Sequence, residues 1–383
     1  EIPTTFEAFE DACEALLAIG VDPIYEPVAD GWHQTMLWTE NAQVLDKVEP
    51  GIIDKLNSNE ATFAENENML TMLEQLNDLA QKGYFGDNYM SDEFSGAEGY
   101  LASGEFVYEN PDAGLWAYLS PTLQVEIIKY TQPAFPRVWF VTDLKFKPES
   151  ETLTQVLYPD ARFEGQLTWP ETLAQSARLV LGINGDYYPY RVNRKTNVGN
   201  IIRNRKILYT YSNKISAYPI LDTAALRDDG TMSVYAAGEI TSQELLDQGD
   251  VHDALSFGPY LARDGKLRIW NGSSWNATEP RCAIGMISAG HYRIINVEGR
   301  FAKGVGPAGI NINQLACLMY AQGVTEAQNL DGGNTAVLIF MGRKLNRTAS
   351  KTGKTETSPR NMAELIGIGT SEAVARDQID RKE

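Results

Sequence analysis

Two aspartates in glycine-containing turns are the side chains of this chain best suited to chemistry. Asp186 follows Asn184 and Gly185 in NGDYYPYR, and Asp331 begins DGGN before an apolar run. Functional side chains are commonly carried on loops that a rigid scaffold positions. Paired carboxylates can divide acid, base and charge-stabilising work between them, so we take Asp186 and Asp331 as the candidate catalytic pair.

Arginines and glycines next to these runs suit the binding of an anion. Arg281 in PRCAIGM and Arg360 in PRNMAELIGIG each precede an apolar run. A guanidinium fork matches the oxygens of a phosphate, and the backbone amides of adjacent glycines can approach an anion closely. We therefore predict these substrate- or phosphate-binding residues: Asn184, Gly185, Arg281, Gly332, Gly333, Asn334 and Arg360.

Two further ionisable residues are candidates for the catalytic set. Glu298, in INVEGR, is the reserve carboxylate, and His252 either shuttles a proton near neutral pH or forms a hydrogen bond in the core. A calcium site at Asp186 and Asp331 is the alternative, although no run has the spacing of a calcium loop. We expect no required cofactor and leave a divalent metal such as calcium open.

The cysteines do not suggest a structural framework. Cys13, Cys282 and Cys317 are widely spaced and form no C-x-x-C pair, and the chain has only three histidines. This argues against a disulfide framework or a cysteine-ligated zinc site. We expect Cys282 and Cys317 to be small buried hydrophobic residues.

Charge divides the chain into two parts. Residues 1–118 carry 24 Asp or Glu against three Lys, a net charge of −21, whereas residues 119–383 have a net charge of +3. Such a break in composition predicts two modules with a boundary near Leu119. Nucleic acid is excluded as a partner of the acidic part, because phosphates would meet a surface of like charge. No apolar run is long enough to span a bilayer.

The sequence of the acidic module predicts a helix-rich structure. Thr4 and Glu7 have the spacing of a capping box ahead of an amphipathic helix that ends near Gly20, and a second helix is predicted over residues 60–81. Trp32 and Trp38 in GWHQTMLW either stack on sugars or anchor packing. The order PTTFEAFEDACEALLAIGVDPI, GW, KGYF and YLASGEFVYENPDAGLW over residues 2–117 resembles the middle of extracellular solute-binding proteins for sugars, without their opening lobe and closing segment.

The second module reads as strand-rich. Residues 138–146 alternate as a strand does, and RLVLGI, IIRNRKILYT and VLIFMGRKL add further strands and turns. Helices are few: Thr241 with Glu244 caps one, and Asn311 begins another that stops at Gly323. Strands and helices do not alternate regularly, so we predict an α+β fold, a strand-rich mixed catalytic module with few helices.

The ordered motifs of this module resemble one family. NGDYY, SFGPYL, PRCAIG, NLDGGNT and PRNMAELIGI follow the order of conserved blocks in the phosphodiester glycosidase family, over about residues 119–369. Cys282 stands where a Thr is usual, and Asn334 replaces a third glycine or small residue. The resemblance implies a hydrolase that cleaves a sugar, N-acetylglucosamine or a related one, from its phosphodiester.

Other function classes are weaker. The chain has no G-x-S-x-G, and its glycines lack the spacing of a P-loop or a dinucleotide fold. The alternative to an enzyme is a non-catalytic carbohydrate-binding or cell-wall or exopolysaccharide assembly protein. We expect a carbohydrate or glycosyl-phosphate substrate and a secreted or cell-surface bacterial location, since the chain begins at Glu1 without a methionine; the oligomeric state stays open.

Overall fold

A computed structural model provides the fold of this chain. The structure describes residues 3–18, 22–31, 45–87, 89–93, 104, 106–132, 136–157, 167–213, 220–271 and 276–374. Trp32 and Trp38, the candidates for sugar stacking, lie outside these residues. The chain separates into two compact units, Glu1–Gly104 and Glu105–Glu383, and each is described by itself.

The first unit is helical in its described part. It contains the helices α1 (Phe6–Leu17), η1 (Val28–Asp30), α3 (Ile52–Asn57), η2 (Phe63–Glu65) and α4 (Glu67–Gln81). The N-cap of α1 is Thr5, whose side chain accepts a hydrogen bond from the N–H of Ala8. The capping box predicted for Thr4 with Glu7 is therefore wrong, because the cap lies one residue later and Ala8 has no side-chain acceptor to complete a box. The α4 helix begins at Glu67, later than predicted, because Asn66 caps it.

The structure places the division between the units earlier than the change in charge does. Strands β1 (Phe106–Asn110) and β2 (Leu115–Leu119) precede Leu119, yet β2 pairs along its whole length with β3 (Leu123–Gln132). Trp116 and Tyr118 of β2 are buried in the main core of the second unit. The acidic composition therefore runs on into the first strands of the second unit, because strand pairing and not charge sets the boundary.

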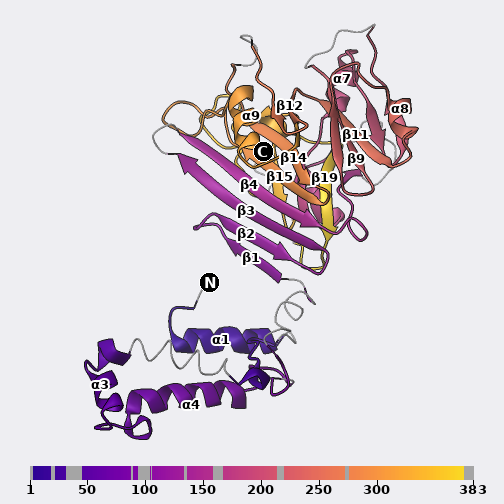
Figure 1. The fold of residues 1–383 in the computed structure, drawn as a ribbon. Helices are drawn as coiled ribbons and strands as arrows, with labels where there is room; N and C mark the ends of the chain where they lie inside the picture. Colours follow the sequence, from indigo (N-terminus) through magenta and orange to yellow (C-terminus); the bar gives the residue numbers. More distant parts are fainter. Residues whose placement is uncertain are drawn as a thin grey trace. The chain divides into compact units, whose positions relative to one another are not determined.

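Three antiparallel sheets form the described part of the second unit (Figure 1). The first has nine strands in the order β1, β2, β3, β4 (Arg137–Phe146), β15 (His291–Val297), β14 (Arg281–Ser288), β16 (Glu326–Asn329), β12 (Tyr260–Arg263) and β13 (Lys266–Leu267). The second has the order β10 (Met232–Tyr235), β9 (Asp222–Arg227), β11 (Val251–Phe257), β7 (Ile201–Arg203) and β8 (Lys206–Tyr209). The third has the order β18 (Arg343–Lys344), β17 (Leu338–Phe340), β6 (Leu179–Asn184), β19 (Glu364–Thr370) and β5 (Thr154–Leu157).

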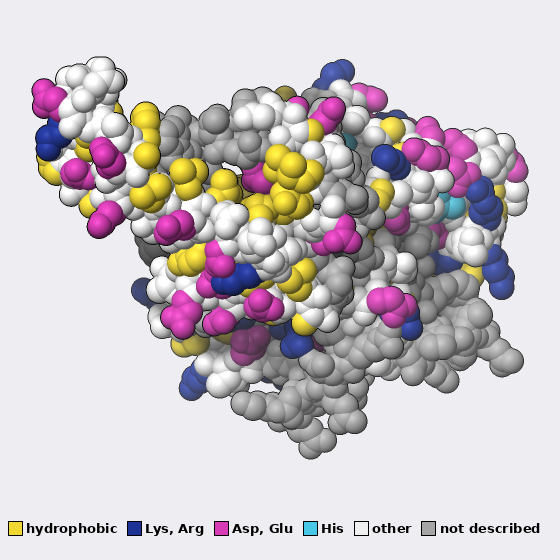
Figure 2. Space-filling view, turned by 90° about the horizontal axis from the view of Figure 1, so that it is seen from below, with side chains coloured by type: hydrophobic (Ala, Val, Ile, Leu, Met, Phe, Trp, Pro, Cys, Tyr) yellow, Lys and Arg dark blue, Asp and Glu magenta, His cyan; other side chains and the backbone are white. Residues whose placement is uncertain are grey.

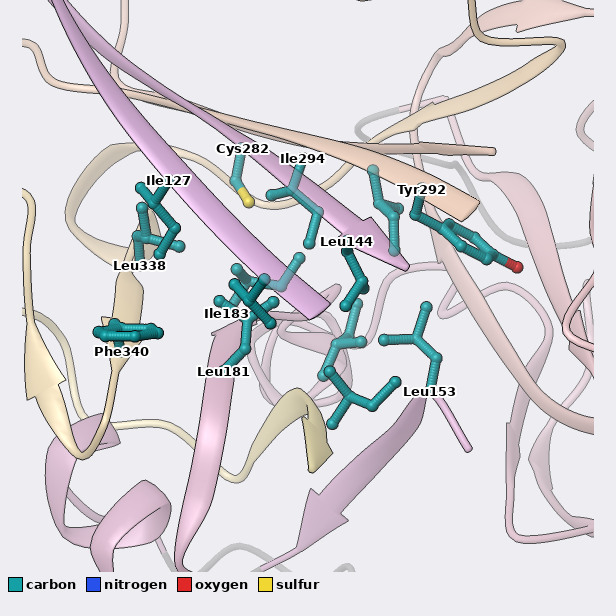
Figure 3. Packing of buried hydrophobic residues seen from close by; sticks show 14 of the residues in the cluster. Ile127, Leu144, Leu153, Leu181, Ile183, Cys282, Tyr292, Ile294, Leu338 and Phe340 are labelled. Atoms are coloured by element: carbon teal, nitrogen blue, oxygen red, sulfur yellow. The ribbon is translucent and has the colours of Figure 1, made fainter. Parts of the chain in front are cut away.

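The main core lies between the nine-stranded sheet and the sheet that contains β6. Figure 3 shows Leu144 and Ile294 of the first sheet directed toward Leu181 and Ile183 of β6. All four side chains are buried, and the alternation of β4 and β15 sends Asp143 and Arg293 to the opposite face. Sheet-on-sheet packing of this kind holds the ends of strands from different sheets at fixed separations.

Few helices accompany the sheets, as the sequence predicted. They are α6 (Pro170–Ser176), α7 (Tyr188–Asn193), α8 (Ser242–Leu246), α9 (Ile312–Tyr320) and the short η5 (Gly333–Thr335). Capping boxes at Thr241 and Asn311 begin α8 and α9, which confirms both predicted starts. The α9 helix packs on the face of the nine-stranded sheet opposite the main core (Figure 1). The α+β prediction is confirmed.

Two further predictions concern the burial of the cysteines and the absence of membrane-spanning segments. Cys282 is buried as expected, but Cys317 is exposed, because it lies on the outer side of α9 between inward-facing Ala316 and Met319. Among the residues that the structure describes, none of the helices has the length and apolarity needed to cross a bilayer. Figure 2 shows a face on which Lys and Arg side chains are scattered among acidic and hydrophobic ones.

The boundary can be tested by truncation. A chain that begins at Glu105 keeps β1 and β2, whereas one that begins at Leu119 loses Trp116 and Tyr118 from the core. Loss of a buried aromatic side chain costs about 3–5 kcal/mol, so the shorter chain should melt more than roughly 10 °C lower in thermal denaturation. Equal melting temperatures would place the boundary at Leu119.

Candidate active site

The three sheets meet where β6 ends and β19 begins. Leu365 of β19 pairs with Asn184, the last residue of β6, so the NGDYY turn lies next to the start of β19. The N–H of Asp331 donates to the carbonyl of Gly185 at 3.3 Å, which brings the chain after β16 to the same place. The NGD and LDGGN runs, which lie far apart in the sequence, are therefore direct neighbours.

Asn184 joins these two runs through its side-chain amide. Its Nδ2 donates to the carbonyls of Asp331 at 2.8 Å and Gly185 at 3.1 Å, and its Oδ1 accepts from the N–H of Val337 at 3.1 Å. The side chain is fully buried. Asn184 and Gly185 thus hold the site together through backbone groups, and their predicted role in contacting substrate is not what the geometry favours.

Asp186 is buried and fully engaged by the protein. One carboxylate oxygen accepts from Nη2 of Arg203 at 3.1 Å, and the other accepts from the N–H of Ser256 on β11 at 2.9 Å. Burial alone would raise the pKa of Asp186, but the guanidinium groups of Arg203 and Arg191 and the hydrogen bonds outweigh burial and lower it. Asp186 is therefore a buried anion that fixes its turn, rather than a carboxylate open to substrate.

Arg203 lies between two buried carboxyl groups. Its Nε and Nη2 donate to the carboxylate oxygens of Glu364 at 2.9 Å each, and its Nη1 donates to the carbonyl of Ala254 at 2.6 Å. Burial raises the pKa of Glu364 well above its ordinary value, and the charge of Asp186 adds to this effect. One guanidinium thus connects β7, β11, β19 and the end of β6.

Asp331 has a different environment. Its side chain is 17 % exposed, and its Oδ2 lies 3.6 Å from Nη1 of Arg360. Its Oδ1 accepts from the N–H of Gly332 at 2.9 Å, and Thr335 adds a side-chain hydrogen bond. Burial raises the pKa of Asp331, against the lowering effects of Thr335, Arg360 and Gly332. Asp331 is thus the more exposed carboxylate of the predicted pair.

Arg360 provides positive charge beside Asp331. Its Nη1 donates to Oγ1 of Thr335 at 2.9 Å, and its side chain remains 38 % exposed. The guanidinium lies over the ring of Tyr187, 4.9 Å from the centroid, and 6.0 Å from that of Tyr190. Tyr187 is held at φ 46°, a left-handed conformation that is unfavourable for a bulky residue and often occurs at functional sites.

The glycines of the DGGN run do not offer free amides. The N–H of Gly332 donates to Asp331, and the N–H of Gly333 donates to the carbonyl of Pro280 at 3.0 Å. Gly332 is required for space, because a Cβ there would lie 2.6 Å from the carbonyl of Pro280. Gly333 has a φ of 63°, which favours glycine, and the guanidinium of Arg300 lies against it. Both N–H groups predicted to bind an anion are therefore used within the protein.

The remaining predicted residues make contacts of other kinds. The guanidinium of Arg281 donates to the carbonyls of Ala277 and Ile310, although its backbone lies next to Gly332. The Asn334 carbonyl accepts from the N–H of Arg360 at 2.9 Å, so Asn334 shapes the turn through its backbone.

Glu298 and His252 are engaged elsewhere. Glu298 is buried and accepts from the backbone N–H and the Nε of Arg347. His252 is buried with its Nδ1 2.9 Å from Asp253, and it precedes Ser256 by four residues on β11, which corresponds to about 13 Å along a strand. Neither geometry supports a place beside Asp331.

The structure gathers some residues that the sequence reasoning did not select. Arg203, Glu364, Tyr187 and Arg300 all belong to the site, and Arg191 donates to the carbonyls of Asp186 and Ser256. A signal for two of them existed: Arg203 and Glu364 are charged residues within otherwise apolar strands. Such charges need a buried partner, which a local pattern cannot identify.

Metal binding has no further support in the described geometry. Within the described part of the chain, no three His, Cys, Asp or Glu side chains lie together in a way that would hold a metal ion. The expectation that no cofactor is required stays a prediction.

Comparison with known proteins identifies the family of this part of the chain. The family profile of phosphodiester glycosidases matches residues 177–369, which include Asp186, Asp331 and Arg360. A curated relative, the uncharacterized SPbeta prophage-derived protein YomE of Bacillus subtilis (strain 168), is 31 % identical over 134 residues. That match covers 34 % of this chain and spans only 20 % of the relative.

Solved structures share the fold. The catalytic domain of zebrafish N-acetylglucosamine-1-phosphodiester alpha-N-acetylglucosaminidase, auto-inhibited by its pro-peptide, aligns with a TM-score of 0.50 at 20 % identity, over 66 % of this chain and 85 % of that one. A hypothetical protein from Synechocystis aligns with a TM-score of 0.43 at 14 % identity, over 65 % of this chain and 62 % of that one. The similarity of the first unit to solute-binding proteins stays a prediction.

The burial of Glu364 predicts how the free energy of unfolding changes with pH. The unfolded chain releases this proton near the ordinary pKa of 4.5, whereas the folded chain keeps it to higher pH. The unfolded state then binds fewer protons, so this contribution to stability is lost as pH rises, by at most about 1.4 kcal/mol per pH unit. Between about pH 5 and pH 8, the free energy of unfolding in urea should therefore fall less steeply for Glu364→Gln than for the wild type.

A matched control is Glu239→Gln. The hydrogen bond from Arg263 lowers the pKa of Glu239, so its contribution to stability is lost only in acid, and this variant should keep the wild-type slope above pH 5. Identical slopes for wild type and Glu364→Gln would show that Glu364 is ionised in the folded protein.

Proposed function

The chain belongs to the phosphodiester glycosidase family, and we propose that it hydrolyses the bond between a sugar and a phosphodiester in an extracellular or cell-surface glycan. The observation that carries this proposal is the 3.6 Å pairing of the partly exposed Asp331 with Arg360. A carboxylate and a guanidinium side by side can act on the two halves of such a substrate, the electron-poor sugar carbon and the anionic phosphate.

Arg360 is suited to the phosphate. The bond from the anomeric carbon to the phosphate oxygen breaks, its electron pair goes to that oxygen, and the phosphate leaves as a monoester. A phosphate is a good leaving group, so positive charge beside it matters more than a strong general acid. The exposed guanidinium of Arg360 provides that charge locally in a protein of net charge −18.

Asp331 is suited to the sugar. In the proposed reaction its carboxylate accepts a proton from the attacking water, whose oxygen bonds to the anomeric carbon, and it stabilises the positive charge that develops on the ring. A raised pKa makes a carboxylate a better proton acceptor, and burial raises that of Asp331. Asp186 takes no direct part in this scheme; it positions the turn that carries Tyr187.

Tyrosine rings next to Arg360 are suited to hold the sugar ring. Tyr187 and Tyr190 are stacked with ring centroids 6.4 Å apart, and Tyr190 is 42 % exposed. Aromatic faces combine apolar contact area with a polar edge, a combination suited to a sugar ring. The zebrafish protein whose fold this chain shares acts on N-acetylglucosamine 1-phosphodiesters by its name, so we choose N-acetylglucosamine as the first sugar to test.

Product analysis on a panel of α-linked sugar phosphodiesters tests the proposal. A phosphodiester glycosidase releases free sugar and a phosphomonoester, in equal amounts. Release of sugar 1-phosphate would instead indicate cleavage at the other ester bond and would overturn the reaction proposed. Binding of these compounds without any product would favour the non-catalytic carbohydrate-binding alternative.

The Asp331→Asn variant should lose most turnover while remaining folded. The amide of Asn has the shape of the carboxylate, so the turn is kept. The variant lacks the proton acceptor, and this loss should lower the rate by roughly 100-fold or more. Asp229→Asn is a matched control, because Asp229 also accepts a backbone N–H in a turn, that of Thr231, and lies on a different loop. Sugar release by Asp331→Asn at the control rate would remove Asp331 from the catalytic set.

The Arg360→Lys variant should bind phosphate more weakly. Lysine keeps the charge but loses the fork, at a cost of about 1.5–3 kcal/mol for hydrogen bonds to a charged group. We expect a matching loss in kcat/KM on a sugar phosphodiester, together with weaker inhibition by inorganic phosphate. Arg205→Lys, at an exposed pair with Asp228, should change neither value; normal kinetics in Arg360→Lys would contradict the assignment.

A further inference from the structure

A cavity lies on the face of the nine-stranded sheet that packs against α9. It has a volume of about 430 Å³ and is formed where the β3–β4 ends meet the first turn of α9. Gln132 and Trp139 line it from the strands, and Gln314 and Cys317 line it from the helix. A cavity of this size is within the range of small-ligand sites.

The lining of this cavity suits a sugar unit with an adjacent phosphate. Its described lining combines the indole of Trp139 with the planar amides of Gln132 and Gln314 and the guanidinium of Arg137. The ring of Trp139 is fixed by stacking on Tyr130, with centroids 5.4 Å apart and planes 13° apart. A pre-ordered aromatic face and hydrogen-bonding amides match a sugar, and a guanidinium matches an anion.

Backbone contacts connect this cavity to the candidate active site. The N–H of Gly333 donates to the carbonyl of Pro280, and the next residue, Arg281, donates through Nε to the carbonyl of Ile310 at 3.3 Å. Ile310 lines the cavity. Arg281, which does not reach Asp331 through its guanidinium, thus supports the wall of this cavity.

We propose that this cavity is an accessory subsite that binds one sugar unit of a phosphodiester-linked glycan, with the phosphate beside Arg137. This inference rests on the proposed function for its choice of ligand. Trp139 provides the stacking face, and the amides of Gln132 and Gln314 provide hydrogen bonds to hydroxyl groups. Such a subsite retains a polymeric substrate without taking part in bond cleavage.

Cys317 offers a direct measurement of occupancy. It is exposed and lines the cavity, whereas Cys13 and Cys282 are buried, and burial raises the pKa of the Cys282 thiol to about 12. Labelling by N-ethylmaleimide should therefore report on Cys317, because the thiolate is the reactive form. The measurement uses the full chain as the Asp331→Asn variant, so that hydrolysis does not consume the ligand.

The probe is an oligomer of N-acetylglucosamine units joined through phosphodiesters, and the neutral comparison is a chitin oligosaccharide of equal length. At about ten times its Kd, the phosphodiester oligomer should slow labelling of Cys317 about tenfold, by mass action. The chitin oligosaccharide should protect less. No protection by either oligomer, or equal protection by both, would overturn the proposal.

Two variants test the lining. Gln132→Glu, at an exposed strand end, places a carboxylate in the cavity and should abolish protection by the phosphodiester oligomer. Trp139→Ala should abolish protection by both oligomers; protection that persists in both variants would contradict the assignment. With Asp331 intact, Trp139→Ala should raise KM on the oligomer and leave kcat/KM on a single sugar phosphodiester unchanged, and absence of turnover in the wild type would count against the proposed function alone.

Discussion

The buried guanidinium of Arg203 is the interaction on which the site depends. It contacts Asp186, Glu364 and the carbonyl of Ala254, and so it fixes parts of two sheets relative to one another. Charges taken out of water cost several kcal/mol each unless they are paired and hydrogen-bonded. Two carboxylates beside Arg203 repel one another, and burial together with the charge of Asp186 raises the pKa of Glu364. The network is costly to break, and it therefore specifies one arrangement of the turns.

Buried and exposed charges have different roles in this arrangement. Both carboxylate oxygens of Asp186 accept hydrogen bonds, one from Arg203 and one from the backbone of β11, and Tyr187, the next residue, has a left-handed conformation. Asp331 and Arg360 stand at the edge of the same network with part of their surface open to solvent. The fixed inner charges keep the outer pair in place, and preorganised charge is what stabilises a developing transition state.

Recognition of an anion in the proposed reaction has to be local. The net charge is −18, with −21 in residues 1–118 and +3 in the rest of the chain, so the overall field repels phosphodiesters. Arg360 opposes that field in the candidate site, and Arg137 does so in the cavity beside α9. Contacts of Pro280 and Arg281 connect the two places, which agrees with one extended glycan chain as the proposed substrate.

The sequence by itself determined the fold class, the capped helices at Thr241 and Asn311, and the order of motifs that places the chain in its family, because these follow from local periodicity and spacing. It could not distinguish Asp186 from Asp331, which look alike as aspartates in glycine turns. Only the tertiary structure decided that Arg203 and Ser256 bury one and that Arg360 stands beside the other. The structure also shows that Arg281 contacts the carbonyls of Ala277 and Ile310 and that Glu298 pairs with Arg347. The physical reason is that burial, pKa and hydrogen-bond partners depend on residues brought together from distant parts of the chain, which no local pattern contains.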